Sequence, residues 1–167
     1  PRFGFENAPD TDSALEQNRV WGREILERSK STQLGLKALK ENELSSTAEV
    51  DGLIGSVIDA SKPWGEKSGA ERAEVLRNVG IHLGLNRGKL LEVMAAEAGK
   101  TLDQGDTEVS EAIDFANYYA LLAERQEKVD GATPVPANLT LVIPPWNFPT
   151  AIPTGGVLAA LATGSGV

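Results

Sequence analysis

The stretch Leu139-Thr140-Leu141-Val142-Ile143-Pro144-Pro145-Trp146-Asn147-Phe148-Pro149 decides the fold class of this 167-residue chain. Its first five residues form a short apolar run bounded by turn residues, which is typical of a strand buried on both faces of a parallel sheet. The prolines at 144–149 predict a loop. The small apolar residues of 151–162 predict a helix packed closely on a sheet. Strand, loop and helix in this order are the opening of a βαβ unit.

A single strand of this buried type cannot satisfy its own ladder hydrogen bonds. We therefore expect the chain to be a fragment that is cut inside an α/β domain. A fragment of this kind should expose an apolar patch, and it should either self-associate or leave its last segment disordered.

Upstream of this stretch the pattern is helical. The spacing S-x-x-E at Ser46–Glu49 and again at Ser68–Glu71 predicts two capping boxes, each opening a helix. Asp12 is a further candidate N-cap, and Gly99 is a candidate C-cap. Apolar residues recur at helical spacing behind these signals: Leu15, Trp21, Ile25 and Leu26; Val50, Leu53, Ile54, Val57 and Ile58; Val75, Leu76, Val79 and Leu83; Val109, Ala112, Ile113, Ala116, Tyr119, Ala120 and Ala123.

Between these helices, residues 31–45 read as a loop with some helical character, and the segment Lys62-Pro63-Trp64-Gly65 is expected to stop the helix that begins after Ser46. The fold class is therefore mainly α, with the first strand–loop–helix of an α/β domain. We divide the chain into a leader with a helix at 1–45, a helical part at 46–138, and the start of an α/β domain at 139–167.

Composition excludes several classes of function. The net charge of −8 and the pI near 4.7 disfavour nucleic acid and anionic membranes as partners. No apolar stretch approaches the roughly 18–20 residues of a membrane-spanning helix, and the first residues lack a signal-peptide pattern, so we expect a cytoplasmic protein. The absence of cysteine excludes a thiol nucleophile and thiolate metal ligands within these residues.

In its context after an apolar run and before a Gly/Ala-rich helix, Pro145–Pro149 resembles the hallmark loop of the aldehyde dehydrogenase superfamily. By this resemblance Asn147 helps to form the oxyanion hole, the backbone before it lines the nicotinamide end of the cofactor cleft, and Phe148 packs beside the substrate tunnel. The expected cofactor-binding residues are thus Ile143, Pro144 and Trp146. An amide on a Pro-flanked turn can be aimed rigidly at a developing alkoxide. The alternative is a surface turn in which the Asn bonds its own backbone.

Weaker matches occur in the family's order. Glu97–Thr101 resembles its Glu-Thr-Gly-Lys-Pro turn, although Ala98 and Thr101 depart from it, and 108–120 resembles the helix that precedes the cofactor domain. Ser68–Arg72 resembles the start of the long amino-terminal helix. In the leader, residues 5–21 resemble the segment that enters the aldehyde dehydrogenase module of the bifunctional family proline utilization A, with Ala8 as a departure.

The resemblance implies an NAD(P)-dependent parent enzyme that oxidises L-glutamate γ-semialdehyde to L-glutamate, with FAD in an absent proline dehydrogenase domain. It also implies a small-molecule aldehyde substrate and a homo-oligomer. The parent would use a cysteine nucleophile and a glutamate base that this chain lacks, so the chain alone is predicted to be inactive. The alternatives are a single-function enzyme for another aldehyde, such as succinate semialdehyde, and a non-catalytic acidic helical interaction module.

Other residue types suggest chemistry less strongly. His82 lies one step off an apolar stripe and is expected to be solvated. Glu108, Glu111 and Asp114 lie three apart on one predicted helix, but without a second cluster they indicate a hydrated surface, so no metal site is predicted. Gly155-Gly156 lacks the order of a Rossmann fingerprint. Trp21 and Trp64 are expected to be core or interface aromatics.

Overall fold

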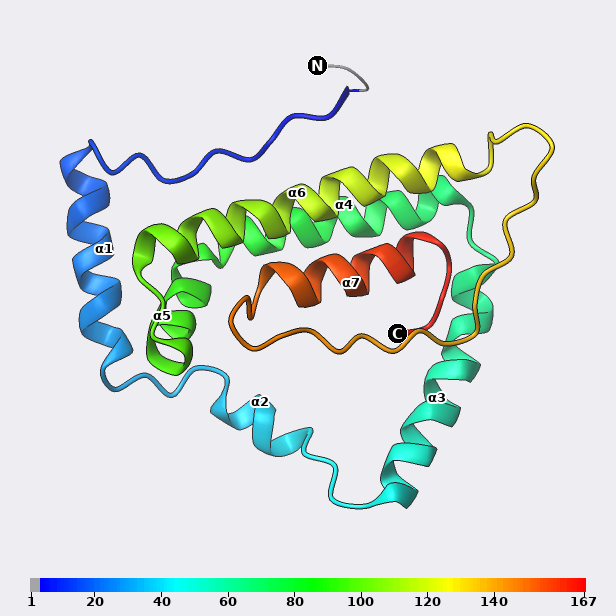
Figure 1. Cartoon of the computed structure of the whole chain (residues 1–167), viewed down its shortest axis with the longest axis horizontal. Coiled ribbons are helices and arrows are strands. Elements are labelled where there is room, and N and C mark those ends of the chain that lie inside the picture. The colour runs from blue at the N-terminus through cyan, green and yellow to red at the C-terminus, as the bar shows by residue number, and fades with distance from the viewer. Residues whose placement is uncertain (1–3) are drawn as a thin grey trace.

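The structure is a computed structural model that describes residues 4–167, so the first three residues of the predicted leader lie outside the described part. Figure 1 shows a long pair of helices, α4 and α6, with α7 beneath them and α1, α2 and α3 around the edge. The helices are α1 (Glu16–Ser29), α2 (Leu36–Glu41), α3 (Thr47–Gly65), α4 (Gly69–Leu85), α5 (Arg87–Ala98), α6 (Leu102–Gln126) and α7 (Ala151–Ala162).

Local signals placed most of the helix ends correctly. Both predicted capping boxes are present, because the Ser46 and Ser68 side chains accept the N–H groups of Glu49 and Glu71 and the two glutamates bond back to the caps. Gly99 is the C-cap of α5 at φ 63°. The predicted cap at Asp12 is wrong, since α1 begins at Glu16 with Leu15 as its N-cap. The Asp12 carboxylate instead accepts the N–H of Ala14.

The two interruptions of the helical pattern lie where the sequence predicts them, since α3 ends within the segment Lys62–Gly65 and the only helix inside 31–45 is short. Pro63 lies inside α3, which continues to Gly65. Pro63 removes one N–H donor from the helix, and only two residues of α3 follow it. Within the predicted loop at 31–45, residues Leu36–Glu41 form the short helix α2.

The main core lies between α4, α6 and α7. Its fully buried members are mostly alanines, whose small side chains let the three helices approach closely: Ala73, Leu76, Ala116, Ala120, Ala123, Leu158 and Ala162. Gly69 marks the closest approach of α4 to α6, since a Cβ there would overlap the carbonyl of Ala123. Trp64 packs against this core and donates from Nε1 to the carbonyl of Leu161 at 3.0 Å, as expected for a core aromatic.

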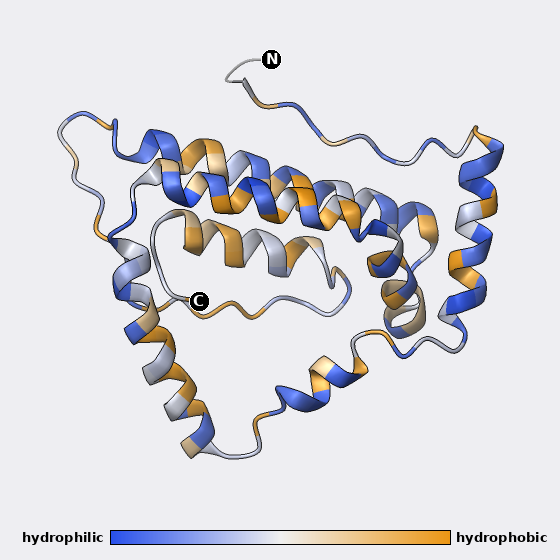
Figure 2. Ribbon diagram, turned by 180° about the vertical axis from the view of Figure 1, so that it is seen from behind, coloured by the Kyte–Doolittle hydropathy of each residue, from blue (hydrophilic) through white to orange (hydrophobic). Residues whose placement is uncertain are grey.

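A second, smaller core joins α1 to α5 and α6. It consists of Ile25, Leu91, Met94 and Val109, with Trp21 packed against it. The apolar face predicted for α6 is therefore largely confirmed, whereas that of α1 is confirmed only in part, because Leu15 and Leu26 are exposed. The faces predicted for α3 and α4 are confirmed only in part: Val50, Leu53 and Ile54 of α3 and Val75 of α4 are exposed. Figure 2 shows the resulting apolar band along α3, which lies apart from the main core.

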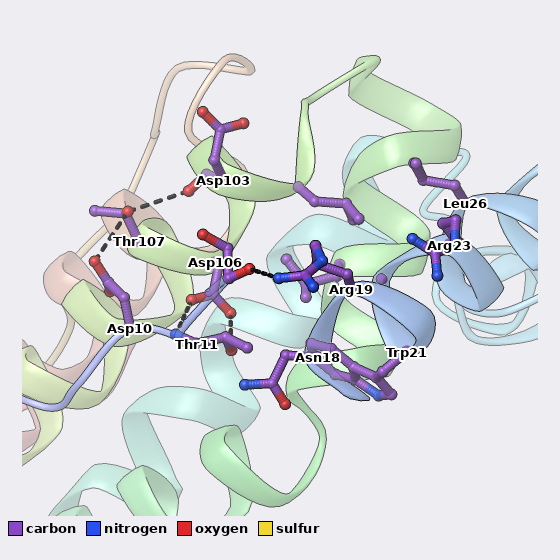
Figure 3. Close-up of a pocket in the computed structure, with 14 residues that line it drawn as sticks. Asp10, Thr11, Asn18, Arg19, Trp21, Arg23, Leu26, Asp103, Asp106 and Thr107 are labelled. Carbon is purple, nitrogen blue, oxygen red and sulfur yellow. Dashed lines mark hydrogen bonds between the residues drawn. The ribbon is translucent and has the colours of Figure 1, made fainter. Parts of the chain in front are cut away.

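The amino-terminal arm, residues 4–14, is fastened along α6 by two aspartates. Asp114 accepts hydrogen bonds from the Asn7 side chain and the Ala8 N–H, both at 2.6 Å. Asp106 accepts from the Thr11 hydroxyl at 2.7 Å and also pairs with Arg87 at 2.8 Å. Figure 3 shows the Asp106 contacts with Thr11 at the edge of a surface pocket that Trp21 helps to line. The arm is thus a docked strap and not a free leader.

The apolar run Leu139–Ile143 is extended but forms no strand, which corrects the predicted buried strand. Leu141 is 78% exposed and Ile143 is 81% exposed. The only backbone bond of this run to a distant segment within residues 4–167 joins the Thr140 N–H to the carbonyl of Gly166 at 2.8 Å. A ladder needs a neighbour along its whole length, and residues 163–167 return beside only one end of the run.

The predicted helix at 151–162 is confirmed with the same bounds. Among the helices formed by residues 4–167, none has the length and apolar content required to cross a membrane.

Candidate functional site

The loop Pro144–Pro149 presents its two central side chains to solvent. Trp146 is 80% exposed, and Asn147 is exposed beside it. Within the described residues, the Asn147 amide has no hydrogen-bond partner, so it is not tied to its own backbone as the surface-turn alternative requires. An uncommitted NH₂ on a surface loop is available to donate to a ligand oxygen.

Behind this exposed tip, the carboxyl end of the loop is fixed to α6. Glu108 is 2% exposed, and its Oε1 accepts the N–H of Thr150 at 2.6 Å and the N–H of Ala151 at 3.0 Å. These are N–H groups that the first turn of α7 leaves without a partner in the helix. The carboxylate therefore caps α7 from a neighbouring helix, 42 residues away in sequence.

Lys100 completes the arrangement. Its side chain is 11% exposed and pairs with the other oxygen of Glu108. Its ammonium also lies 4.3 Å from the centre of the Phe148 ring, an attractive cation–π geometry. A further contact comes from the Thr150 hydroxyl, which bonds to Met94 Sδ at 3.3 Å. Phe148, Thr150 and Ala151 are thus each fixed by a contact with Lys100 or Glu108.

The sequence pattern does not predict this cluster of charges. The spacing of Glu108, Glu111 and Asp114 predicts a hydrated surface. Only Glu111 is exposed and without a bond among the described residues, whereas Glu108 is buried and Asp114 anchors the arm. The available signal was Glu108 lying on the same helical turn as the fully buried Val109 and Ala112, where an ionised group needs a partner. His82 is exposed, as expected.

The four predicted site residues fall into two adjacent parts of the surface. Trp146 and Asn147 line a pocket of about 600 Å³ together with Lys100, Phe148 and residues of α6. Ile143 and Pro144 line a different pocket of about 300 Å³, whose other walls include Phe115 and Tyr119. The pocket shown in Figure 3 includes none of these four residues.

The lining of the smaller pocket limits which ligand groups it could accept. The apolar and aromatic lining around Ile143 and Pro144 suits the face of a flat ring. The N-terminus of α7, which could otherwise receive a phosphate, is already occupied by the Glu108 carboxylate. The neighbouring Gly155 and Gly156 serve protein packing, since a Cβ at either would lie within 3.0 Å of Phe115 or Val142. The amino-terminal end of α7 is thus closed by contacts within the protein, and Ile143 and Pro144 leave an apolar surface beside it.

Comparison with known proteins gives a consistent result. The chain is 37% identical over 123 residues to the bifunctional protein PutA of Klebsiella aerogenes, covering 74% of this chain and 9% of that protein. It is 25% identical over 198 residues to 1-pyrroline-5-carboxylate dehydrogenase of Bacillus pumilus, covering 98% of this chain and 38% of that protein. The chain therefore spans much less than half the length of these relatives.

Among solved structures, proline utilization A from Corynebacterium freiburgense is similar with a TM-score of 0.78 and 36% identity, over 95% of this chain and 15% of that one. A Thermus 1-pyrroline-5-carboxylate dehydrogenase with bound NAD shares the fold with a TM-score of 0.79 at 23% identity, over 96% of this chain and 38% of that one. The sequence profile described as the aldehyde dehydrogenase family matches residues 33–167. The chain belongs to the aldehyde dehydrogenase family.

Proposed function

We propose that this chain is part of an NAD-dependent aldehyde dehydrogenase that oxidises L-glutamate γ-semialdehyde to L-glutamate in proline catabolism, within a bifunctional protein that also oxidises proline with FAD. The names of the PutA and 1-pyrroline-5-carboxylate dehydrogenase relatives support the substrate and the pathway. The observation that carries the proposal is the uncommitted amide of Asn147 on a loop that Glu108 and Lys100 hold from behind.

In this proposal Asn147 stabilises charge in the transition state. Nucleophilic attack on an aldehyde carbonyl places negative charge on its oxygen. An NH₂ group already oriented toward that oxygen stabilises it without reorganising during the step. Because Asn147 makes no bond among the described residues, no protein bond has to break before its NH₂ donates.

Ile143, Pro144 and Trp146 bind the nicotinamide end of the cofactor, which accepts the hydride when bound. Ile143 is 81% exposed and Trp146 is 80% exposed. A flat ring would cover this apolar surface and remove it from water. Covering this surface would also exclude water from the space beside Asn147 and so strengthen its hydrogen bond.

The covalent step requires groups outside these residues. The chain has no cysteine, so the thiolate that attacks the aldehyde in this family must come from elsewhere in the protein. We expect the 167-residue chain alone to form no NADH from aldehyde and NAD. The proposal further includes a cytoplasmic, homo-oligomeric enzyme, as suits a metabolic dehydrogenase.

The function is tested on the complete protein encoded by the gene that contains this chain. Purified protein should reduce NAD with glutamate γ-semialdehyde at a higher kcat/KM than with succinate semialdehyde. Asn147→Ala should lower kcat about 10²–10³-fold, the usual loss when one oxyanion donor is removed. Gln104→Ala, a change in the same pocket, should leave kcat nearly unchanged.

Three results would contradict the proposal: no aldehyde-dependent NADH formation by the complete protein, a preference for succinate semialdehyde, or an unchanged kcat in Asn147→Ala. A reading frame that stops directly after Val167 would instead favour a helical interaction module. A frame that continues into Lys-Pro-x-Glu and a later cysteine supports the enzyme.

A further inference from the structure

Two buried charges lie directly behind the loop that carries Asn147. The Glu108 and Lys100 side chains are 1% and 11% exposed and pair with each other. Removing such groups from water is costly, and a well-packed apolar pair would hold two helices together equally well or better. A buried ion pair at this place therefore calls for a role beyond holding α6 against its neighbours.

The contacts of Glu108 show what an apolar residue could not do. One oxygen accepts both backbone N–H groups that follow Pro149, at 2.6 and 3.0 Å, while the other meets Lys100. These bonds fix the direction in which the chain leaves the loop and enters α7. A bond from two successive N–H groups to one atom restricts rotation of the backbone more than apolar packing does.

Lys100 acts on the neighbouring side chain. It follows Gly99, whose positive φ turns the chain back after α5, and its ammonium rests 4.3 Å from the Phe148 ring centre. Phe148 is bonded directly to Asn147. The ring is thus held by a cation whose own position is set by Glu108.

Lys100 also lines the same pocket as Asn147, which raises the alternative that it attracts the substrate directly. Its pairing with Glu108 argues against this, because the carboxylate already neutralises the ammonium. The ion pair therefore adds little net charge to the pocket, but it fixes the loop at Phe148 and at Thr150.

Resting on the function proposed above, we infer that Glu108 and Lys100 are positioning residues that aim the Asn147 amide at the reacting oxygen. They act through the Thr150 and Ala151 N–H groups and the Phe148 ring, and neither touches substrate. A small displacement of a reacting group can cost about 10²-fold in rate, so loosening this support should reduce turnover without weakening aldehyde binding.

The test uses the complete enzyme with five variants. Lys100→Met and Glu108→Gln each remove one charge, and their combination leaves no unpaired buried charge. Lys100→Arg keeps both the pairing and the contact with the ring. Glu111→Gln, one turn further along α6 and exposed, is the matched control. Steady-state kinetics gives kcat and KM, and hydrogen exchange reports the protection of the Thr150 and Ala151 amides in the same samples.

For Lys100→Met and Glu108→Gln we expect kcat to fall about 10–100-fold with KM for the aldehyde nearly unchanged. The double variant should resemble the single ones, because residues that act as a unit are not additive. Lys100→Arg should restore most of the turnover. Exchange at Thr150 and Ala151 should become faster in Glu108→Gln and stay unchanged in Glu111→Gln.

The outcomes separate the two proposals. If the wild-type enzyme forms no NADH from any aldehyde tested, the proposed function fails, and the positioning role fails with it. If the wild type is active and the folded variants keep its kcat, only the positioning role is overturned. A raised KM with unchanged kcat in Lys100→Met would also overturn it, since Lys100 would then contact the substrate.

Discussion

At residue 69 the backbone of α4 meets the backbone of α6 with no side chain between them. A Cβ at this position would overlap the Ala123 carbonyl oxygen, and that oxygen belongs to helix backbone that cannot move aside cheaply. The Gly69 N–H also donates to the Glu127 side chain. The main core therefore depends on a missing side chain as much as on the alanines around it.

Gly69→Ala should destabilise the chain, although alanine is the better helix former. The propensity gain is at most about 1 kcal/mol, whereas overpacking a tight contact costs typically about 1–3 kcal/mol. We expect a net loss in the free energy of unfolding measured with urea. Gly84→Ala in the same helix is the control, because its Cβ would meet only Ile113 Cδ1, at 3.7 Å. Equal stability of Gly69→Ala and the wild type would show that α4 and α6 can separate slightly at no cost.

Single residues also show where prediction from the sequence ends. Asn147 could be chosen because its loop is a contiguous signal with prolines on both sides. For Glu108 the only signal was its place beside the apolar residues Val109 and Ala112, because its partners are Lys100 and a helix 42 residues away. Its spacing to Glu111 and Asp114 is the spacing of any exposed acidic face. Burial of a carboxylate is decided by tertiary contacts that local pattern does not contain.

At the scale of elements, local chemistry decided where α3 and α4 begin. Each capping box is closed within four residues, so it was visible in the sequence, and α7 kept its predicted bounds. The run Leu139–Ile143 behaved differently, because a strand exists only with a partner. The sequence predicted its extended backbone correctly but not its burial, since burial requires neighbours on both sides.

The capping box of α4 makes the stability of that helix dependent on pH. Bonds from the Ser68 backbone N–H and hydroxyl hold the pKa of Glu71 below its ordinary value. A carboxyl with a lowered folded-state pKa contributes stability above its unfolded pKa, and that contribution is lost as the pH falls through the folded value. The stability difference between the wild type and Glu71→Gln should therefore be present at neutral pH and shrink as the pH falls below the ordinary range of a glutamate pKa.

This difference is measured by urea unfolding of both proteins across the pH range. Glu74→Gln, one turn further along α4 and exposed, is the control and should show a much smaller dependence. A wild-type-to-Glu71→Gln difference that is the same at both pH extremes would mean that the carboxylate charge contributes nothing to the cap.

At the scale of the whole molecule, much apolar surface lies outside the two cores. Leu141 and Ile143 are almost fully exposed on an extended segment with unpaired backbone groups, and α3 carries a second exposed apolar band. Unpaired extended backbone with apolar side chains is a template for pairing with another chain. We expect the isolated 167-residue chain to associate with itself.

Light scattering over a range of protein concentrations should show species larger than the monomer. Leu141→Glu should shift the distribution toward monomer, because a charge at the centre of the extended segment opposes pairing. Leu85→Glu adds the same charge at the end of α4, at a leucine that is 75% exposed, and should have little effect. A monomer at every concentration, or an equal response to both variants, would contradict a role for this segment in association.

The strap formed by the amino-terminal arm also sets an order in time. Thr11 binds Asp106 across 95 residues and Asn7 binds Asp114 across 107 residues, so the arm has nothing to dock on until α6 has been made. At about 5–20 residues per second, synthesis delivers α6 roughly 5–20 seconds after the arm leaves the ribosome. During that interval the arm has no α6 on which to dock, so its hydrogen bonds to Asp106 and Asp114 form only after α6 has been synthesised.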